Sequence, residues 1–80
     1  MSRTLASPLH SALVEFLIAK RKEAGLTQAD VAARLVRYQS FVATVEKGQH
    51  RVDIVDLFLF SQAIGFVSQE AIRYLRECNH

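Results

Sequence analysis

Residues 27–48 read Thr27-Gln28-Ala29-Asp30-Val31-Ala32-Ala33-Arg34-Leu35-Val36-Arg37-Tyr38-Gln39-Ser40-Phe41-Val42-Ala43-Thr44-Val45-Glu46-Lys47-Gly48. Small or apolar residues recur in this stretch at positions that two crossing helices can share: Ala32, Leu35, Val42 and Val45. The small side chain of Ala32 lets a second helix cross closely, and Val42 and Val45 lie on one face of that helix because they are three residues apart. The pattern predicts two short helices joined by a tight turn.

The second of these helices has a polar outer face. Its outward positions hold short or polar side chains, namely Gln39, Ser40, Ala43, Thr44 and Lys47. Because none of them is large and apolar, this face can enter a major groove, where side-chain donors and acceptors meet base edges. The pattern is therefore typical of a DNA-reading helix-turn-helix, here at residues 28–47.

Length and composition limit the remaining possibilities. Eighty residues allow one domain with one small core, and a hydrophobic content of 50% is high for that size. No apolar run reaches the roughly 18 to 20 residues that a membrane span requires, and the N-terminus has no signal-peptide pattern. We therefore expect a cytoplasmic protein with no membrane partner.

Positive charge gathers around the second helix of the motif. The net charge of the chain is only +2, but the segment 34–51 contains one acidic residue, Glu46, and four basic ones. We expect phosphate contacts from this segment, because DNA phosphates would lie beside it. The candidates are Arg37, Lys47, His50 and Arg51. Taken singly, each of them is more often an ordinary solvated side chain, and it is their cluster beside the helix that favours the phosphate role.

Capping residues and glycines predict five helices and no strand. The expected ranges are 8–24, 28–35, 39–47, 54–64 and 69–78. Four of them begin after a residue that can cap a helix, namely Ser7, Thr27, Asp53 and Ser68. Glycines at 25, 48 and 65 end three of them. This indicates an all-α, compact five-helix bundle at residues 7–80, preceded by a flexible arm at residues 1–6.

The segment from Leu13 to Gly65 resembles the phage-repressor and Cro family of helix-turn-helix proteins, often called Xre-like. The residues that carry the resemblance are Gly25-Leu26-Thr27-Gln28, Val31-Ala32, Gln39-Ser40-Phe41-Val42, Val45-Glu46-Lys47-Gly48, Leu57, Ser61, Ile64 and Gly65. The resemblance implies a bundle of about five helices that acts as a homodimer on an inverted-repeat operator near a promoter.

The same resemblance implies roles for particular residues. Gln39 would be the first residue of the recognition helix and would contact adenine. Ser40 and Thr44 would add base contacts, and the small Ala43 would let the helix lie deep in the groove. Gln28 would bind a phosphate and support Gln39. The alternative is that Gln39 and Ser40 are merely solvated residues of a first helical turn.

Three further features follow from the family pattern. Arg21 and Glu46 are expected to form a structural ion pair between the first and third helices. Val36 occupies a position where the family usually has glycine, so the turn is either built differently or strained. Tyr38 replaces the usual Ser, Thr or Pro, and the side-chain cap of the recognition helix is therefore missing.

The last third of the chain has more apolar residues than a small core needs. The run 54–60 is almost entirely apolar, and one helix of a small bundle cannot bury all sides of it. We expect a two-fold dimer contact that includes Phe58, Leu59, Tyr74 and Cys78. The alternative is that these side chains fill a single core.

Catalytic chemistry has little support in the sequence. The histidines at 10, 50 and 80 are scattered, and Cys78 with His80 makes at most half a metal site. We therefore expect no enzyme activity, no metal and no cofactor, and interpret His10 as a surface residue and Cys78 as a partly buried, inert thiol.

Two functional hypotheses remain open. The first is a DNA-binding transcriptional regulator, most simply a repressor, of which a restriction-modification controller is a narrower version. The second is an interaction module, for instance an antitoxin that binds a toxin through its hydrophobic C-terminal surface. One molecule could do both, and the sequence does not rank them.

Overall fold

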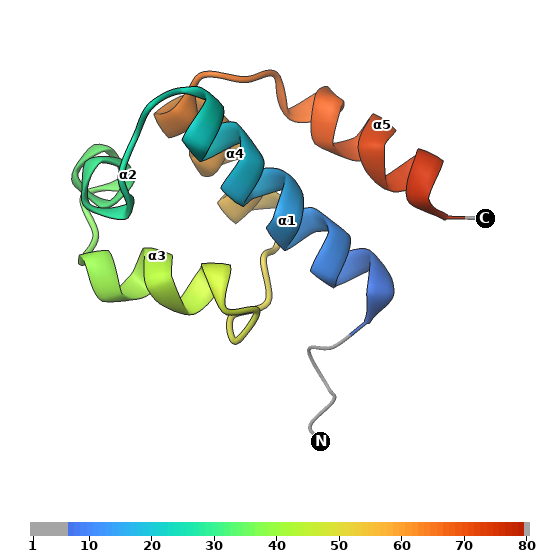
Figure 1. Ribbon diagram of the computed structural model, residues 1–80, viewed down its shortest axis with the longest axis horizontal. Coiled ribbons are helices and arrows are strands. Elements are labelled where there is room, and N and C mark those ends of the chain that lie inside the picture. Colours follow the sequence, from blue (N-terminus) through green and yellow to red (C-terminus); the bar gives the residue numbers. More distant parts are fainter. Residues whose placement is uncertain (1–6, 80) are drawn as a thin grey trace.

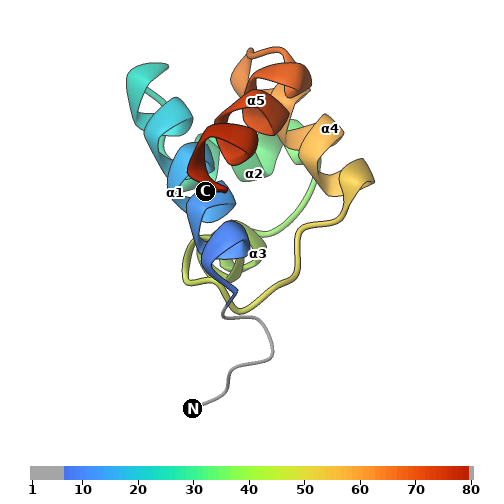
Figure 2. The ribbon, with the colours of Figure 1, turned by 90° about the vertical axis from the view of Figure 1, so that its right-hand side faces the viewer.

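The computed structural model describes residues 7–79, and this part of the chain forms five α-helices and no strand. They are α1 (Pro8–Glu23), α2 (Gln28–Leu35), α3 (Gln39–Glu46), α4 (Ile54–Ile64) and α5 (Ser68–Cys78). Helix α1 runs through the middle, with α3 and α5 towards opposite ends of the molecule (Figures 1 and 2). The predicted all-α, five-helix fold is confirmed, and the helix ranges differ only at their ends. The arm expected at residues 1–6 lies outside the described residues.

Local hydrogen bonds explain where most helices begin. Helix α2 starts with a complete capping box, in which Thr27 and Asp30 each accept the other's backbone N–H at 3.0 and 2.9 Å. The N–H of Thr27 also lowers the pKa of the Asp30 carboxyl, because the hydrogen bond favours its charged form. Helix α4 repeats the box with Asp53 and Asp56. These boxes fix the residues at which α2 and α4 begin, and they do so through local hydrogen bonds rather than through the core.

The start of α5 differs from the prediction. Ser68 is the first helical residue, and Val67 occupies the cap position without a side-chain hydrogen bond. The first turn is closed instead by the backbone, with the N–H of Glu70 donating to the carbonyl of Val67 at 2.9 Å. The prediction that Ser68 caps α5 is therefore wrong by one residue. A serine in the sequence indicates that a helix begins nearby, but it does not fix the first helical residue more closely than this.

The core is centred where α1, α2 and α3 meet, and α4 and α5 complete it with Leu57, Phe60, Ala63, Ile64 and Ala71. Its fully buried large side chains are Leu17, Val31, Val42 and Val45. Ala32 is also buried, which allows α3 to pack closely on α2. Leu35 is only partly buried and packs at the edge of this cluster. The inward face that the sequence predicts for the helix-turn-helix is thus present, except that Leu35 lies at its margin.

His10 was predicted to be a surface residue, and this is wrong. Its side chain is buried, and its Nε2 accepts a hydrogen bond of 3.1 Å from the backbone N–H of Val52. The contact joins the beginning of α1 to the loop between α3 and α4. A neutral imidazole can be buried in this way because its unprotonated nitrogen accepts a hydrogen bond from a buried backbone N–H, and both polar groups are then satisfied.

The turn between α2 and α3 has left-handed geometry at a valine. Val36 has φ 57° and ψ 47°, and its N–H and that of Arg37 donate to the carbonyls of Ala33 and Ala32. A β-branched residue is strained in this conformation. The turn is therefore built in the glycine-like way and is strained. Because 87% of Val36 is exposed, its side chain contributes little packing in return.

We expect Val36→Gly to raise the free energy of unfolding by about 1 kcal/mol, which is the strain relieved less the chain entropy that glycine adds. In a domain of this size the unfolding midpoint should rise by about 4 to 8 °C. Val36→Ala is the control, because it keeps a Cβ in the left-handed conformation. Thermal unfolding of the three proteins would contradict the interpretation if Gly and Ala had equal effects.

Candidate nucleic-acid interface

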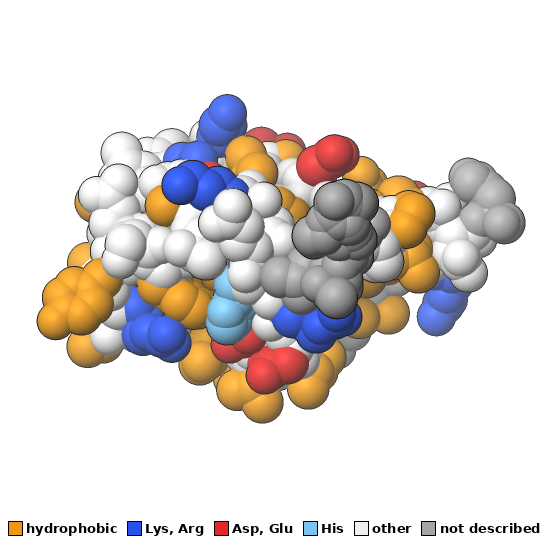
Figure 3. Space-filling model, turned by 90° about the horizontal axis from the view of Figure 1, so that it is seen from below, with side chains coloured by type: hydrophobic (Ala, Val, Ile, Leu, Met, Phe, Trp, Pro, Cys, Tyr) orange, Lys and Arg blue, Asp and Glu red, His pale blue; other side chains and the backbone are white. Residues whose placement is uncertain are grey.

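The outer face of α3 is polar and open to solvent. Gln39 and Ser40 are exposed at its beginning, Ala43 and Thr44 are partly exposed along it, and Lys47 is exposed at its end. The Thr44 hydroxyl donates to the Ser40 carbonyl at 2.8 Å, so its oxygen lone pairs and its methyl group remain for an outside contact. Figure 3 views the molecule from the side on which α3 lies and shows Lys and Arg side chains that are separated from one another, with hydrophobic side chains towards the left and lower edges of the view.

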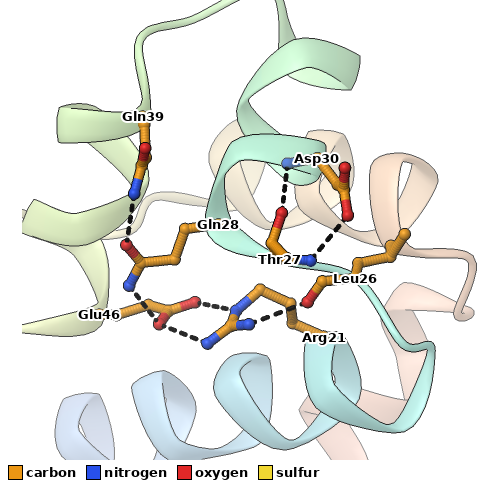
Figure 4. A network of polar contacts seen from close by, with 7 residues as sticks. All are labelled: Arg21, Leu26, Thr27, Gln28, Asp30, Gln39 and Glu46. Carbon is orange, nitrogen blue, oxygen red and sulfur yellow. Dashed lines mark hydrogen bonds and ion pairs between the residues drawn. The ribbon is translucent and has the colours of Figure 1, made fainter.

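A nearly buried ion pair fixes α3 against α1. Arg21 donates through Nε to Glu46 Oε2 at 2.6 Å and through Nη2 to Glu46 Oε1 at 3.0 Å. The two side chains are only 12% and 10% exposed. Arg21 also donates through Nη1 to the carbonyl of Leu26, just before α2. The pair therefore joins α1, the beginning of α2 and the end of α3 (Figure 4).

Two glutamines extend this network to the surface. Gln28 Nε2 donates to Glu46 Oε1 at 2.9 Å, and Gln39 Nε2 donates to Gln28 Oε1 at 3.4 Å. Figure 4 shows Gln28 between the ion pair and Gln39. The structure thus brings together four residues that the sequence analysis treated as two separate pairs. The bond between Gln28 and Glu46 was missed, because the sequence contains no local signal for a contact across 18 residues.

Basic side chains lie around α3, but not all of them extend freely into solvent. The Arg37 guanidinium stacks over the Phe41 ring, 3.8 Å from its centroid. His50 Nε2 lies 3.1 Å from Asp56 Oδ2, and its ring packs edge-on against Phe41. Arg51 is exposed in the loop after α3. The charges flank α3 as expected, although His50 is already engaged by an acidic residue.

Tyr38 is a largely exposed side chain at the beginning of α3. It was noted only for the cap it fails to provide, and the structure shows no side-chain cap at that position. The tyrosine is 85% exposed directly before Gln39. It is therefore a large side chain at the edge of the candidate interface.

The four residues assigned to a dimer contact do not lie in one environment. Phe58 and Leu59 are exposed on α4 beside Ile54 and Val55, which together form an apolar stripe. Tyr74 is partly buried, and its ring lies 5.3 Å from that of Phe16 in α1. We call Ile54, Val55, Phe58 and Leu59 the α4 stripe.

Cys78 is exposed, so the prediction of a partly buried thiol is wrong. It lies beside the first residues of α1, where Ser7, Pro8 and Leu9 line an open hollow with it. Contact with Cys78 raises the pKa of the Tyr74 phenol.

Other site types find no support in the described part of the chain. Residues 7–79 contain no group of three or more His, Cys, Asp or Glu side chains placed to hold a metal ion. Within the same range, every helix is too short or too polar to cross a membrane.

Comparison with known proteins places the chain in a family. No family model and no curated protein matches it. Among solved structures, an XRE-family like protein from Pseudomonas syringae pv. tomato str. DC3000 is 33% identical, with a TM-score of 0.84 over 90% of this chain and 88% of that one. The chain belongs to the XRE family.

Two more distant structures share the XRE-family fold. The clp gene regulator ClgR from C. glutamicum is 19% identical with a TM-score of 0.81, and covers 94% of this chain and 97% of its own. The restriction-modification controller protein C.Esp1396I, solved as a tetramer in complex with its natural 35 base-pair operator, is 21% identical with a TM-score of 0.80, over 90% of this chain and 95% of that one. At these identities the likeness shows the fold alone.

We expect Arg21→Ala to lower the free energy of unfolding of this XRE-family protein by about 3 to 5 kcal/mol, because it leaves the buried Glu46 carboxylate without its cationic partner. Lys20→Ala is the matched control. It removes a 2.7 Å ion pair with Glu70 that solvent screens, and should cost far less.

Urea unfolding of both variants measures the difference. Arg21→Ala combined with Glu46→Ala should recover part of the loss, because no charge is then left unpaired. Equal losses in Arg21→Ala and Lys20→Ala would contradict the structural role of the buried pair.

Proposed function

We propose that this protein is a sequence-specific, double-stranded DNA-binding transcriptional regulator that inserts α3 into the major groove. The observation that carries the proposal is the exposed polar face of α3, which begins at Gln39 and is held by the network in Figure 4. A helix of this kind, supported from behind by a rigid core, meets the geometric needs of base recognition. The operator complex of the controller protein C.Esp1396I supports the same use of the shared fold.

The proposed contacts divide into base and phosphate contacts. Base contacts come from the outer face of α3, namely Gln39, Ser40, Ala43 and Thr44. Phosphate contacts come from the residues around it, namely Gln28, Arg37, Lys47, His50 and Arg51. Among the latter, His50 contributes least, because its Nε2 faces Asp56.

We propose that the protein acts as a homodimer on an inverted repeat and represses transcription by competing with polymerase for promoter DNA. The α4 stripe is the surface on which we place the two-fold contact, because exposed apolar side chains adjacent on one helix face favour burial by a partner. A two-fold dimer would present two α3 helices about 34 Å apart, one helical turn of DNA. Phe58 and Leu59 lie at the centre of this contact, and Tyr74 and Cys78 at most at its margin.

A second candidate function uses the same stripe. In an antitoxin-type module, a different protein would cover the α4 stripe. The exposure of apolar side chains favours such a partner as much as it favours a second copy of the chain. The two candidates differ in the oligomeric state of the purified protein, because only self-association gives a dimer without a partner.

Selection of bound duplexes from random DNA tests the DNA-binding proposal. We expect wild-type protein to enrich one site, and Gln39→Ala to lose the preference at one base pair of each half-site, at a cost of about 1 to 3 kcal/mol. Gln69→Ala is the matched control, because Gln69 is exposed in the first turn of α5, away from α3. Lys47→Ala should weaken binding to all sequences and reduce its salt dependence.

An unchanged preferred site in Gln39→Ala would refute the choice of reader. If no duplex were enriched by the wild-type protein, the proposal of sequence-specific binding would fail as a whole.

Sedimentation equilibrium tests the homodimer. We expect wild-type protein to dimerise at micromolar concentration and Phe58→Lys to raise the dissociation constant by at least about tenfold, since it places a charge in an apolar contact. Val67→Lys is the control, because Val67 is exposed and apolar but lies outside the α4 stripe. A wild-type protein that stays monomeric well above micromolar concentration would exclude the dimer and favour the antitoxin-type module.

A further inference from the structure

The hydrogen bonds that connect Arg21 to Gln39 converge on the Glu46 carboxylate from two sides. Arg21 donates to Glu46, Gln28 donates to Glu46, and Gln39 donates to Gln28. A charged carboxylate can only accept hydrogen bonds, whereas each glutamine amide has one accepting and one donating side and can be turned either way. The charge of Glu46 therefore decides which way both amides face.

The first amide in the series is oriented by the carboxylate itself. Gln28 turns its NH2 group towards Glu46 Oε1 at 2.9 Å. In the opposite orientation its carbonyl oxygen would face a carboxylate oxygen, and two acceptors would meet with no hydrogen between them. Hydrogen bonds to a charged group are stronger than neutral ones, so the orientation is strongly preferred.

The second amide is oriented by the first. With its NH2 group directed at Glu46, Gln28 presents Oε1 towards α3, and Gln39 turns its own NH2 group to that oxygen. The contact of 3.4 Å is longer than the inner one, so it orients the exposed amide without immobilising it. Gln39 is left with its carbonyl oxygen and its second N–H for an outside partner.

We propose that Glu46 determines the base preference of this protein by orienting Gln39 through Gln28. The inference rests on the proposed function. Adenine presents in the major groove an N6 donor and an N7 acceptor, which match the free oxygen and N–H of the oriented Gln39 amide. Guanine presents two acceptors there, which an amide with its oxygen facing outward fits poorly.

Each residue then has a distinct role. Gln39 contacts the base, while Gln28 and Glu46 are positioning residues, and Arg21 holds the Glu46 carboxylate in place. The bond from Gln28 is additional to the ion pair, because Arg21 already contacts both carboxylate oxygens. Orienting Gln39 before DNA arrives also reduces the side-chain entropy that binding must overcome.

Gln28→Met tests the proposal without disturbing the ion pair. Methionine preserves the length of the side chain and its helix propensity, but cannot pass hydrogen-bond direction from Glu46 to Gln39. Gln69→Met is the matched control, with the same substitution at an exposed first-turn position of α5. The measurement is the ratio of affinities for A·T and G·C duplexes at the base pair whose preference is lost in Gln39→Ala.

We expect Gln28→Met to lower this ratio by about tenfold, because the Gln39 amide is then no longer oriented towards adenine, and to leave the preferences at other positions unchanged. Gln69→Met should change neither. If Gln28→Met weakens binding to all duplexes by one common factor, Gln28 is only a phosphate contact and the proposal is overturned. If Gln39→Ala itself changes no preference, the reader assignment under the proposed function fails, and that result is distinguishable from the first.

A second measurement examines the amide directly and needs no DNA. In NMR relaxation, the side-chain NH2 group of Gln39 should be more ordered than that of Gln69 in the wild-type protein, and equally mobile in Gln28→Met. Glu46→Gln supplies a complementary test in folded protein, because a neutral amide can accept or donate and so releases the orientation of Gln28. Its A·T to G·C ratio should fall as in Gln28→Met, and a wild-type Gln39 amide as mobile as that of Gln69 would overturn the proposal.

Discussion

The pair of Arg21 and Glu46 is the interaction on which the geometry of the candidate interface depends. It is nearly buried, and both carboxylate oxygens are bonded by the guanidinium. A buried charge is tolerated only when its hydrogen-bonding capacity is satisfied, so the residues around it have little freedom to move. Because the pair also bonds the backbone before α2 and the side chain of Gln28, one charge position determines how α1, α2 and α3 lie relative to one another.

The helix-turn-helix accepts local strain to reach this arrangement. The left-handed conformation of Val36 reverses the chain between α2 and α3 so closely that Ala32 and Val42 are both buried at the crossing. The energy gained by packing these helices on the core exceeds the cost of an unfavourable backbone angle at an exposed residue. His10 adds a second restraint, because its bond to Val52 fixes the loop that leaves α3.

The molecule separates two kinds of surface. The outer face of α3 is polar and flanked by cations, whereas the α4 stripe is apolar and belongs to another helix. Figures 1 and 2 show that α3 and α4 lie on different sides of α1. DNA and a second protein surface could therefore be engaged at once. This separation is what a dimeric DNA-binding protein requires, and it connects the two parts of the proposed function.

The sequence by itself determined the five helices, the caps of α1, α2 and α4, and the exposed position of Gln39 and Ser40. These features depend on hydrogen bonds and apolar spacing within a few residues, such as the capping boxes of Thr27 and Asp53. Only the tertiary structure decided that His10 is buried, that Cys78 is exposed, and that Gln28 links Glu46 to Gln39. These features depend on contacts between residues far apart in the chain, and such contacts exist only once the helices have packed.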